Sequence, residues 1–208
     1  ETGRYTEETG ERIIRDYGTE LQIIGCEKEG NFTLGDIKKL RGVIMPGFVK
    51  AHGHDHESPI IGVAKDEPLT AWLDHAVNLF TGFMNEKRNI LEKKFGKSPN
   101  YITYIKARLD DIYYGITSSM VHHCNHNKYR VEEIVRANLK AGTKMIVAVG
   151  AQDRNYDERI LDTPDASVKR MDEYIKKFAV TERTWIIPGP DQDFSNGPEQ
   201  LKALKKWA

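Results

Sequence analysis

The feature that most constrains the fold is an alternation of short apolar runs with amphipathic segments. The apolar runs at 116–121, 144–149 and 184–187 each precede a segment in which apolar residues recur at three- and four-residue steps, and the last such segment starts at Pro198. Parallel strands need a crossover connection, which is usually a helix, so this alternation is typical of parallel β/α architecture. We therefore predict an α/β fold with a parallel sheet.

The ends of the predicted helices carry recognisable signals. Two helices precede residue 116, one opening at Asp66-Glu67-Pro68 and one at Ser98-Pro99, because acids, serine and proline are favoured around a first turn. A later helix is expected to close at Gly142 and another to be capped by Ser167. No Gly-x-Gly-x-x-Gly follows any of the predicted strands, so nothing favours a dinucleotide-binding sheet.

Another apolar run, at residues 43–51, leads to a pair of histidines. The run breaks at Pro46-Gly47 and ends at His52 and His54. Strand side chains alternate, so two histidines two positions apart point the same way, and imidazole suits Zn²⁺ or Fe²⁺. We predict that His52 and His54 are metal ligands. His56 continues the alternation and competes for this role, but the Pro-Gly spacing favours the earlier pair.

Residues 45–54 resemble the first-strand signature of the amidohydrolase superfamily, which comprises metal-dependent hydrolases built on a (β/α)8 barrel. Residues 62–73 look like the segment after the first strand in chlorohydrolases and cytosine-deaminase-like aminohydrolases, where Asp/Glu-x-Pro-Leu-x-x-Trp-Leu recurs. The resemblance implies that Trp72 forms a wall of the substrate site. Helical spacing alone places Trp72 in the core.

The second predicted strand ends in another histidine pair. Val121-His122-His123-Cys124 is similar to the Asp-His-His form of some aminohydrolases, with Val121 in the place of the aspartate. The resemblance implies substrate contacts for His122 and His123. Neighbouring residues on a strand point to opposite sides, so we expect one of the two to face the site. A structural histidine is the alternative.

Residues 189–201 resemble the fourth-strand segment that relatives write as His-Ala-Pro-Tyr-Thr-x-Ser-Pro-Glu-x-Leu. Alignment on Pro198-Glu199 puts Asp191 at the position of that substrate-contacting histidine. An acid at this position implies altered specificity, for a more basic or donor-rich substrate. Lost activity, or an aspartate that caps the turn, are the alternatives.

The domain prediction follows from the number of units. Residues 1–42 resemble part of a small N-terminal β-sandwich, and residues 43–208 contain four β/α units. A closed TIM barrel needs eight strands and roughly 250 residues, and half a barrel leaves two strand edges unpaired. We therefore expect the first half of a metal-dependent (β/α)8 TIM barrel, whose partner is the remaining half. Two copies closing on each other, a homo-oligomer, is the alternative.

The resemblance also implies an activity. A divalent metal, Zn or alternatively Fe, would bind His52 and His54, with the catalytic groups and further ligands downstream of Ala208. The implied reaction is hydrolysis of a C–N bond, most consistent with deamination of a nitrogenous heterocycle. A catalytic zinc normally has three protein ligands, so the chain alone is expected to bind metal weakly and to be inactive. A dehalogenating hydrolase and a non-catalytic barrel that serves assembly or partner binding are the alternatives.

Composition excludes several other classes. Lys and Arg number 31 and balance 31 Asp and Glu, so no net charge favours nucleic acid or an anionic membrane. No apolar run approaches the roughly 20 residues that span a bilayer. The two cysteines, Cys26 and Cys124, are far apart, which fits a reducing compartment. We expect a cytoplasmic protein that acts on a small-molecule substrate.

Overall fold

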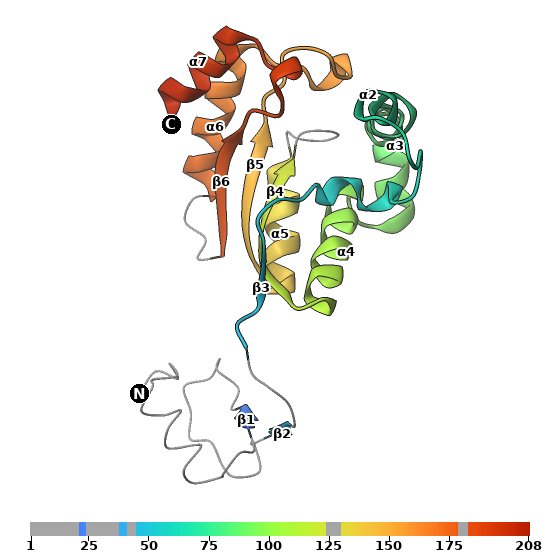
Figure 1. Ribbon diagram of the computed structural model, residues 1–208, viewed down its shortest axis with the longest axis vertical. Helices are drawn as coiled ribbons and strands as arrows, with labels where there is room; N and C mark the ends of the chain where they lie inside the picture. The colour runs from blue at the N-terminus through green and yellow to red at the C-terminus, as the bar shows by residue number, and fades with distance from the viewer. Residues whose placement is uncertain (1–20, 24–37, 41–44, 124–129, 179–182) are drawn as a thin grey trace. The chain divides into compact units, whose positions relative to one another are not determined.

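A computed structural model describes residues 21–23, 38–40, 45–123, 130–178 and 183–208 (Figure 1). The chain divides into two compact units, Glu1–Pro46 and Gly47–Ala208. In the first unit, strand β1 (Leu21–Ile23) pairs antiparallel with strand β2 (Lys38–Leu40). The rest of the predicted β-sandwich segment lies outside the described residues.

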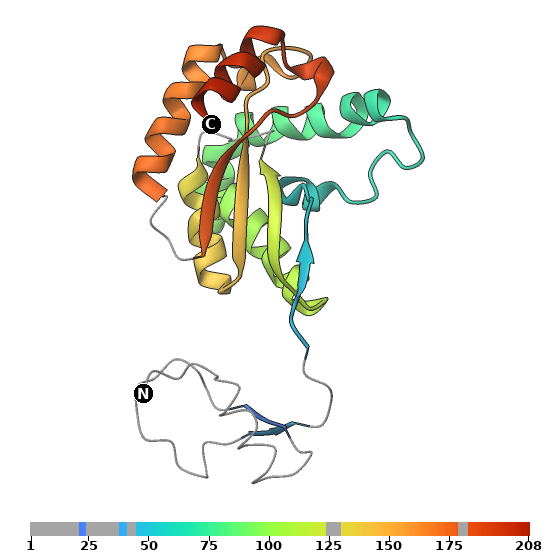
Figure 2. The ribbon, with the colours of Figure 1, turned by 60° about the vertical axis from the view of Figure 1, so that its left-hand side comes forward.

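The second unit is built on a four-stranded sheet in the order β3-β4-β5-β6. Every neighbouring pair in this sheet is parallel, as Figure 2 shows. The bounds are Phe48–Lys50 for β3, Ile116–His123 for β4, Lys144–Gly150 for β5 and Thr184–Gly189 for β6. The strands lie side by side in the order of the sequence, which confirms the predicted α/β fold with a parallel sheet.

Helices fill the connections between the strands. The first helical stretch begins directly after Pro68 and continues from α2 through a π-helical turn, Leu73–Val77, into α3. The α-helical bounds are Leu69–Trp72 for α2, Asn78–Phe95 for α3, Pro99–Tyr113 for α4, Val131–Ala141 for α5, Pro164–Phe178 for α6 and Pro198–Trp207 for α7. Within the described parts of the chain, no helix is both long and apolar enough to cross a bilayer.

The predicted cap at Ser167 is wrong. Helix α6 already begins at Pro164, and the Thr163 side chain accepts a hydrogen bond from the Ala166 backbone N–H at 3.2 Å. Ser167 is buried inside the helix, where its Oγ accepts a hydrogen bond from Gln200 Nε2 at 2.6 Å. The sequence did contain the correct signal, because a threonine before a proline is a common helix start.

The short strand β3 depends on a glycine at its entrance. A Cβ atom at Gly47 would overlap the side chain of Thr117 on β4. The next residue, Phe48, donates its backbone N–H to the Gly115 carbonyl at 2.8 Å. The Pro-Gly step therefore lets β3 approach β4 closely, although β3 is shorter than the run predicted at 43–51.

The two faces of the sheet have different environments. Buried strand residues pack against helices α4, α5 and α6 and form one core, which includes Tyr104, Val121, Ile134, Met145, Val147, Met171 and Ile186. The opposite face carries His122, Ala148 and Ile187 in one row across three strands. On that face Ile146 and Trp185 remain 37% and 45% exposed. The open face thus carries side chains that are not packed into the core beneath the helices.

A buried network of charges ties the end of β3 to helix α4. Lys50 Nζ lies 2.8 Å from both Asp55 Oδ1 and Asp111 Oδ2. The fully buried Arg108 pairs with Asp55 and with Asp111, the latter at 2.7 Å. Ser119 on β4 accepts a hydrogen bond from Arg108 Nη1 at 2.7 Å. Two cations and two carboxylates therefore compensate one another, and of the four side chains only that of Lys50 is partly exposed.

Replacing Arg108 with methionine is expected to destabilise the protein strongly. The change leaves Asp55 and Asp111 buried with one cation between them, and removing one partner of a buried ion pair costs about 3–5 kcal/mol. Urea unfolding followed by circular dichroism measures the free energy of unfolding.

Lys106→Met is the matched control on the same helix. Lys106 pairs with Asp110 at 2.5 Å, but both side chains are about half exposed. Exposed pairs contribute less than about 1 kcal/mol. Equal losses of stability in the two variants would contradict the structural role given to the buried network.

Candidate metal and substrate site

His52 and His54 follow β3 directly and remain attached to β4. The Gly53 carbonyl between them accepts a hydrogen bond from the His122 backbone N–H at 2.8 Å. This contact continues the pairing of the two strands beyond Lys50, the last residue of β3. Both histidines are therefore held at the carboxyl end of the parallel sheet, the end at which β/α barrels build their sites.

The rings of His52 and His54 converge. Their Nε2 atoms lie 3.0 Å apart, and their ring centroids are 4.8 Å apart. Two nitrogen ligands of a tetrahedral zinc are separated by about 3.3 Å, given Zn–N bonds of about 2.0–2.1 Å. The two nitrogens thus fit joint coordination of a divalent cation with little movement.

His122 completes a cluster of three imidazoles. Its ring centroid lies 4.5 Å from that of His52 and 5.6 Å from that of His54. His122 belongs to the open face of the sheet, in the row with Ala148. It is thus placed to contact a molecule bound beside the histidine pair.

Partial burial favours the neutral form of two of these imidazoles. Desolvation lowers the pKa of His54 below its ordinary value of 6.5, and nearby Glu57 offsets part of this effect. The pKa of His122 is also lowered, first by desolvation and then by His52, while Asp191 opposes the change. A neutral imidazole has a free lone pair, which metal coordination requires.

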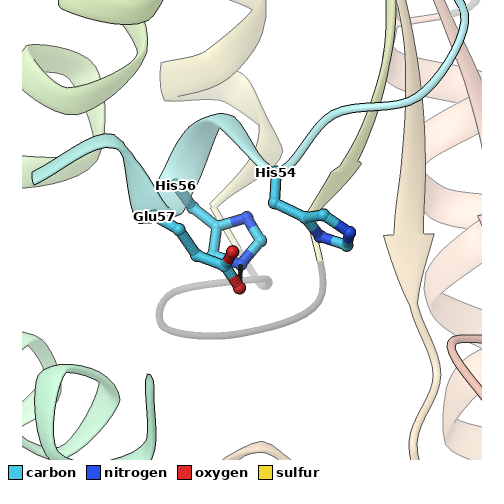
Figure 3. A group of neighbouring side chains, drawn as sticks. All are labelled: His54, His56 and Glu57. Carbon is cyan, nitrogen blue, oxygen red and sulfur yellow. Dashed lines mark ion pairs between the residues drawn. The ribbon is translucent and has the colours of Figure 1, made fainter. Parts of the chain in front are cut away.

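A second group of potential ligands shares His54. Ligand atoms of His54, His56 and Glu57 all lie within 4.8 Å of one another. The fully buried His56 places Nε2 3.2 Å from Glu57 Oε1, and Figure 3 shows these two side chains together with the His54 ring apart from them. The closer approach of the His52 and His54 nitrogens favours the first pair as the ligands.

His123 lies on the other side of the sheet. It is fully buried, and its Nδ1 lies 2.8 Å from the hydroxyl of Tyr104 on α4. Since His122 and His123 are neighbours on β4, they point to opposite faces. The structure therefore brings His122 to His52 and His54 but keeps His123 on the face that the helices cover. This placement agrees with the expectation that one of the two histidines faces the site, and substrate contact by His122 stays a prediction.

Trp72, at the end of α2, is half-buried rather than part of the core. It lines a cavity of about 480 Å³ together with His54, Glu57 and Lys50. Helical periodicity alone would have placed this indole in the interior. The cavity lies next to the predicted metal ligands but includes neither His52 nor His122 in its lining.

Asp191 follows β6 and forms a contact that the sequence did not predict. Tyr156, in the loop after β5, donates its hydroxyl to Asp191 Oδ2 at 2.6 Å. The Tyr156 ring is stacked with that of Phe194 at a centroid distance of 6.2 Å. No motif marked Tyr156. Its position after a parallel strand, at the edge where the other candidates gather, was the only signal available.

The fold and the three imidazoles define a parallel β/α protein with a candidate metal site at the carboxyl ends of its strands. No protein-family model matches the chain. The chain is 23% identical to 5-methylthioadenosine/S-adenosylhomocysteine deaminase of Thermococcus kodakarensis, over 90% of this chain and 40% of that protein. It is 26% identical to guanine deaminase of Escherichia coli, over 82% of this chain and 36% of that protein.

Solved structures with a similar fold include a deaminase and a chlorohydrolase. Guanine deaminase from C. acetobutylicum, with guanine bound in its active site, has a TM-score of 0.63 at 22% identity, over 77% of this chain and 36% of the other. A mutant of the atrazine chlorohydrolase TrzN from Arthrobacter aurescens, complexed with zinc and atraton, has a TM-score of 0.63 at 16% identity, over 77% of this chain and 38% of the other.

These relatives and structural neighbours fall in the amidohydrolase superfamily, which confirms the resemblance drawn from the sequence. The neighbours are amidohydrolase TIM barrels, and the parallel sheet of this chain matches part of such a barrel. The chain spans 40% and 36% of the length of the two curated relatives named above.

Replacement of His52 or of His54 by glutamine is expected to weaken zinc binding by more than tenfold. Loss of an outer-shell partner alone costs about 10- to 100-fold in metal affinity, and loss of a direct ligand should cost more. Equilibrium dialysis against buffered zinc gives the affinity. His75→Gln is the control, because His75 is exposed and pairs with Glu67 at 2.6 Å. Unchanged affinity in His52→Gln would contradict the ligand assignment.

The metal-free protein is expected to show a dependence on pH that follows from two half-buried imidazoles. His54 and His122 should titrate below 6.5 in NMR spectra. As the pH falls below this value, the unfolded chain binds protons that the folded chain does not, so the free energy of unfolding should decrease. Titration of either ring at or above 6.5 would contradict the assigned burial.

Proposed function

We propose that this chain forms the metal-binding half of a hydrolase that cleaves C–N bonds, and that the complete enzyme deaminates a nitrogenous heterocycle. The observation that supports this most is the convergence of the His52 and His54 Nε2 atoms, 3.0 Å apart, at the carboxyl end of a parallel sheet. Both curated relatives described above are named as deaminases, one of them for guanine.

The metal is proposed from the donor set. Two neutral imidazoles suit Zn²⁺ or Fe²⁺, and the zinc complex of TrzN favours zinc. His52 and His54 would hold the ion, whose chemistry there is to lower the pKa of a water toward neutrality and so supply a nucleophile. A catalytic zinc site takes three protein ligands, so we propose that the remaining half of the barrel supplies at least one more.

His122 is proposed to orient the substrate. A neutral imidazole has one N–H donor and one acceptor nitrogen, so it can hold a polar ring substituent beside the histidine pair. Its lowered pKa keeps this neutral form in place at pH 7. His123, which is hydrogen-bonded to Tyr104 on α4, would hold β4 in place from the face of the sheet that the helices cover.

Two domains are part of the same proposal. Residues 1–42 would contribute to a small β-sandwich, and residues 43–208 would form the first four β/α units of the barrel.

A cytoplasmic location is proposed because Cys26 and Cys124 are widely separated along the chain, which fits a reducing compartment.

Ammonia release by the complete, metal-loaded protein tests the function. We expect turnover of at least one amino-substituted heterocycle in a panel containing guanine and 5-methylthioadenosine, loss of turnover after chelation, and recovery when zinc is restored. His122→Gln should lower kcat/KM about 10- to 100-fold, the loss expected for one polar contact to substrate. His75→Gln should have no effect. The proposed deaminase activity would be refuted if the zinc-loaded protein released no ammonia from any heterocycle in the panel.

Dehalogenation is the second candidate, since the chlorohydrolase TrzN shares the fold. Chloride release from a chlorinated triazine separates this reaction from deamination. A protein that retains zinc at His52 and His54 but releases neither product would support the non-catalytic alternative.

A further inference from the structure

Hydrogen bonds join the loops after β5 and β6 at the carboxyl edge of the sheet. The Asp153 backbone N–H donates to the Ser195 carbonyl at 3.0 Å, and Asp153 Oδ1 accepts from the Gly197 N–H at 2.9 Å. The Asn155 side chain donates to the Phe194 carbonyl. These bonds fix the two segments that carry Tyr156 and Asp191, so the contact between them is preorganised.

Asp191 is not needed to cap this turn. The turn satisfies its own backbone through Ser195, whose Oγ accepts from the Gln192 N–H at 3.0 Å, and through Asp153. In the part of the chain that the structure describes, the hydrogen bond to Asp191 comes from Tyr156 and engages Oδ2. The capping alternative for Asp191 is therefore not favoured.

Among the described residues, no cation forms an ion pair with Asp191. Arg154 is held by Asp153, with Nε 2.8 Å from Oδ1. Asp191 is half-buried and follows β6 at the carboxyl edge of the sheet, two strands away from His122 near the end of β4. A carboxylate with one orienting donor, at the same edge of the sheet as the proposed substrate contact, has acceptor capacity for a ligand.

We propose that Asp191, oriented by Tyr156, is the specificity-determining acceptor of this site, and that it selects substrates whose ring edge carries an amidinium-like cation or paired N–H donors. This inference rests on the proposed function of the site. Hydrogen bonds to an ionised carboxylate are about twice as strong as neutral ones, and a planar pair of N–H donors matches both oxygens. A substrate with a carbonyl at the same edge would place acceptor against acceptor and be rejected.

A matched pair of ligands tests the proposal without any need for turnover. Benzamidine carries a planar amidinium, and benzamide has nearly the same shape with a carbonyl in its place. Calorimetry on the complete, zinc-loaded protein should show benzamidine binding at least about tenfold more tightly than benzamide, the ratio expected for one charge-assisted hydrogen bond. Asp191→Asn should abolish this preference by weakening benzamidine binding.

Asp193→Asn is the control for charge, because Asp193 is an exposed acid two positions away. It should retain the preference. Tyr156→Phe keeps the carboxylate but removes its orienting donor, so it should reduce the preference partly, and it provides a second variant if Asp191→Asn does not fold. A wild-type protein without the preference, or an equal loss in Asp193→Asn, would overturn the inference.

The test separates this inference from the proposed function. A protein that prefers benzamidine through Asp191 but releases no ammonia from any heterocycle would refute the proposed deaminase activity. The proposed role of Asp191 in specificity would still hold. A protein that deaminates heterocycles but binds benzamide as tightly as benzamidine would support the proposed deaminase activity. It would refute the proposed role of Asp191 in specificity.

Discussion

The rest of the structure depends on four partly or fully buried charges that compensate one another between the end of β3 and helix α4. Lys50 and Asp55, which flank the segment with His52 and His54, are both held by residues of α4 or by each other. Buried charges are costly unless paired, so a shift of this segment would leave Arg108 or a carboxylate without its partner. The same interaction that joins β3 to α4 therefore restricts where the two imidazoles can lie.

The alternation of side chains along the strands places structural residues and candidate site residues on opposite faces of the sheet. On β4, Val121 and His123 face the helices and belong to the buried side, whereas His122 faces the open side with His52 and His54. The sheet itself thus separates a residue that stabilises the strand from a residue that can contact a ligand. We propose that Asp191, in the loop after β6, belongs to the second group.

Periodicity and local signals predicted the parallel sheet and most of the helices, because those patterns arise from neighbours in the sequence. The cap at Ser167 was misplaced because Thr163-Pro164 gave a competing start signal. The network of Lys50 and Arg108 joins residues distant in the sequence, and Tyr156 reaches Asp191 from another loop. Such contacts depend on packing, which a single sequence does not encode in any short motif. The sequence predicted that His52 and His54 point the same way, and their rings do converge, although both residues lie beyond the end of β3.

The position of the bound metal tests the central claim most directly. Crystals of the complete protein grown with zinc, with diffraction data collected on both sides of the zinc absorption edge, locate the ion independently of any activity. The account predicts one anomalous peak between the Nε2 atoms of His52 and His54, at about 2.0–2.1 Å from each. A peak on His56 and Glu57 instead, or no peak beside His52, would contradict it.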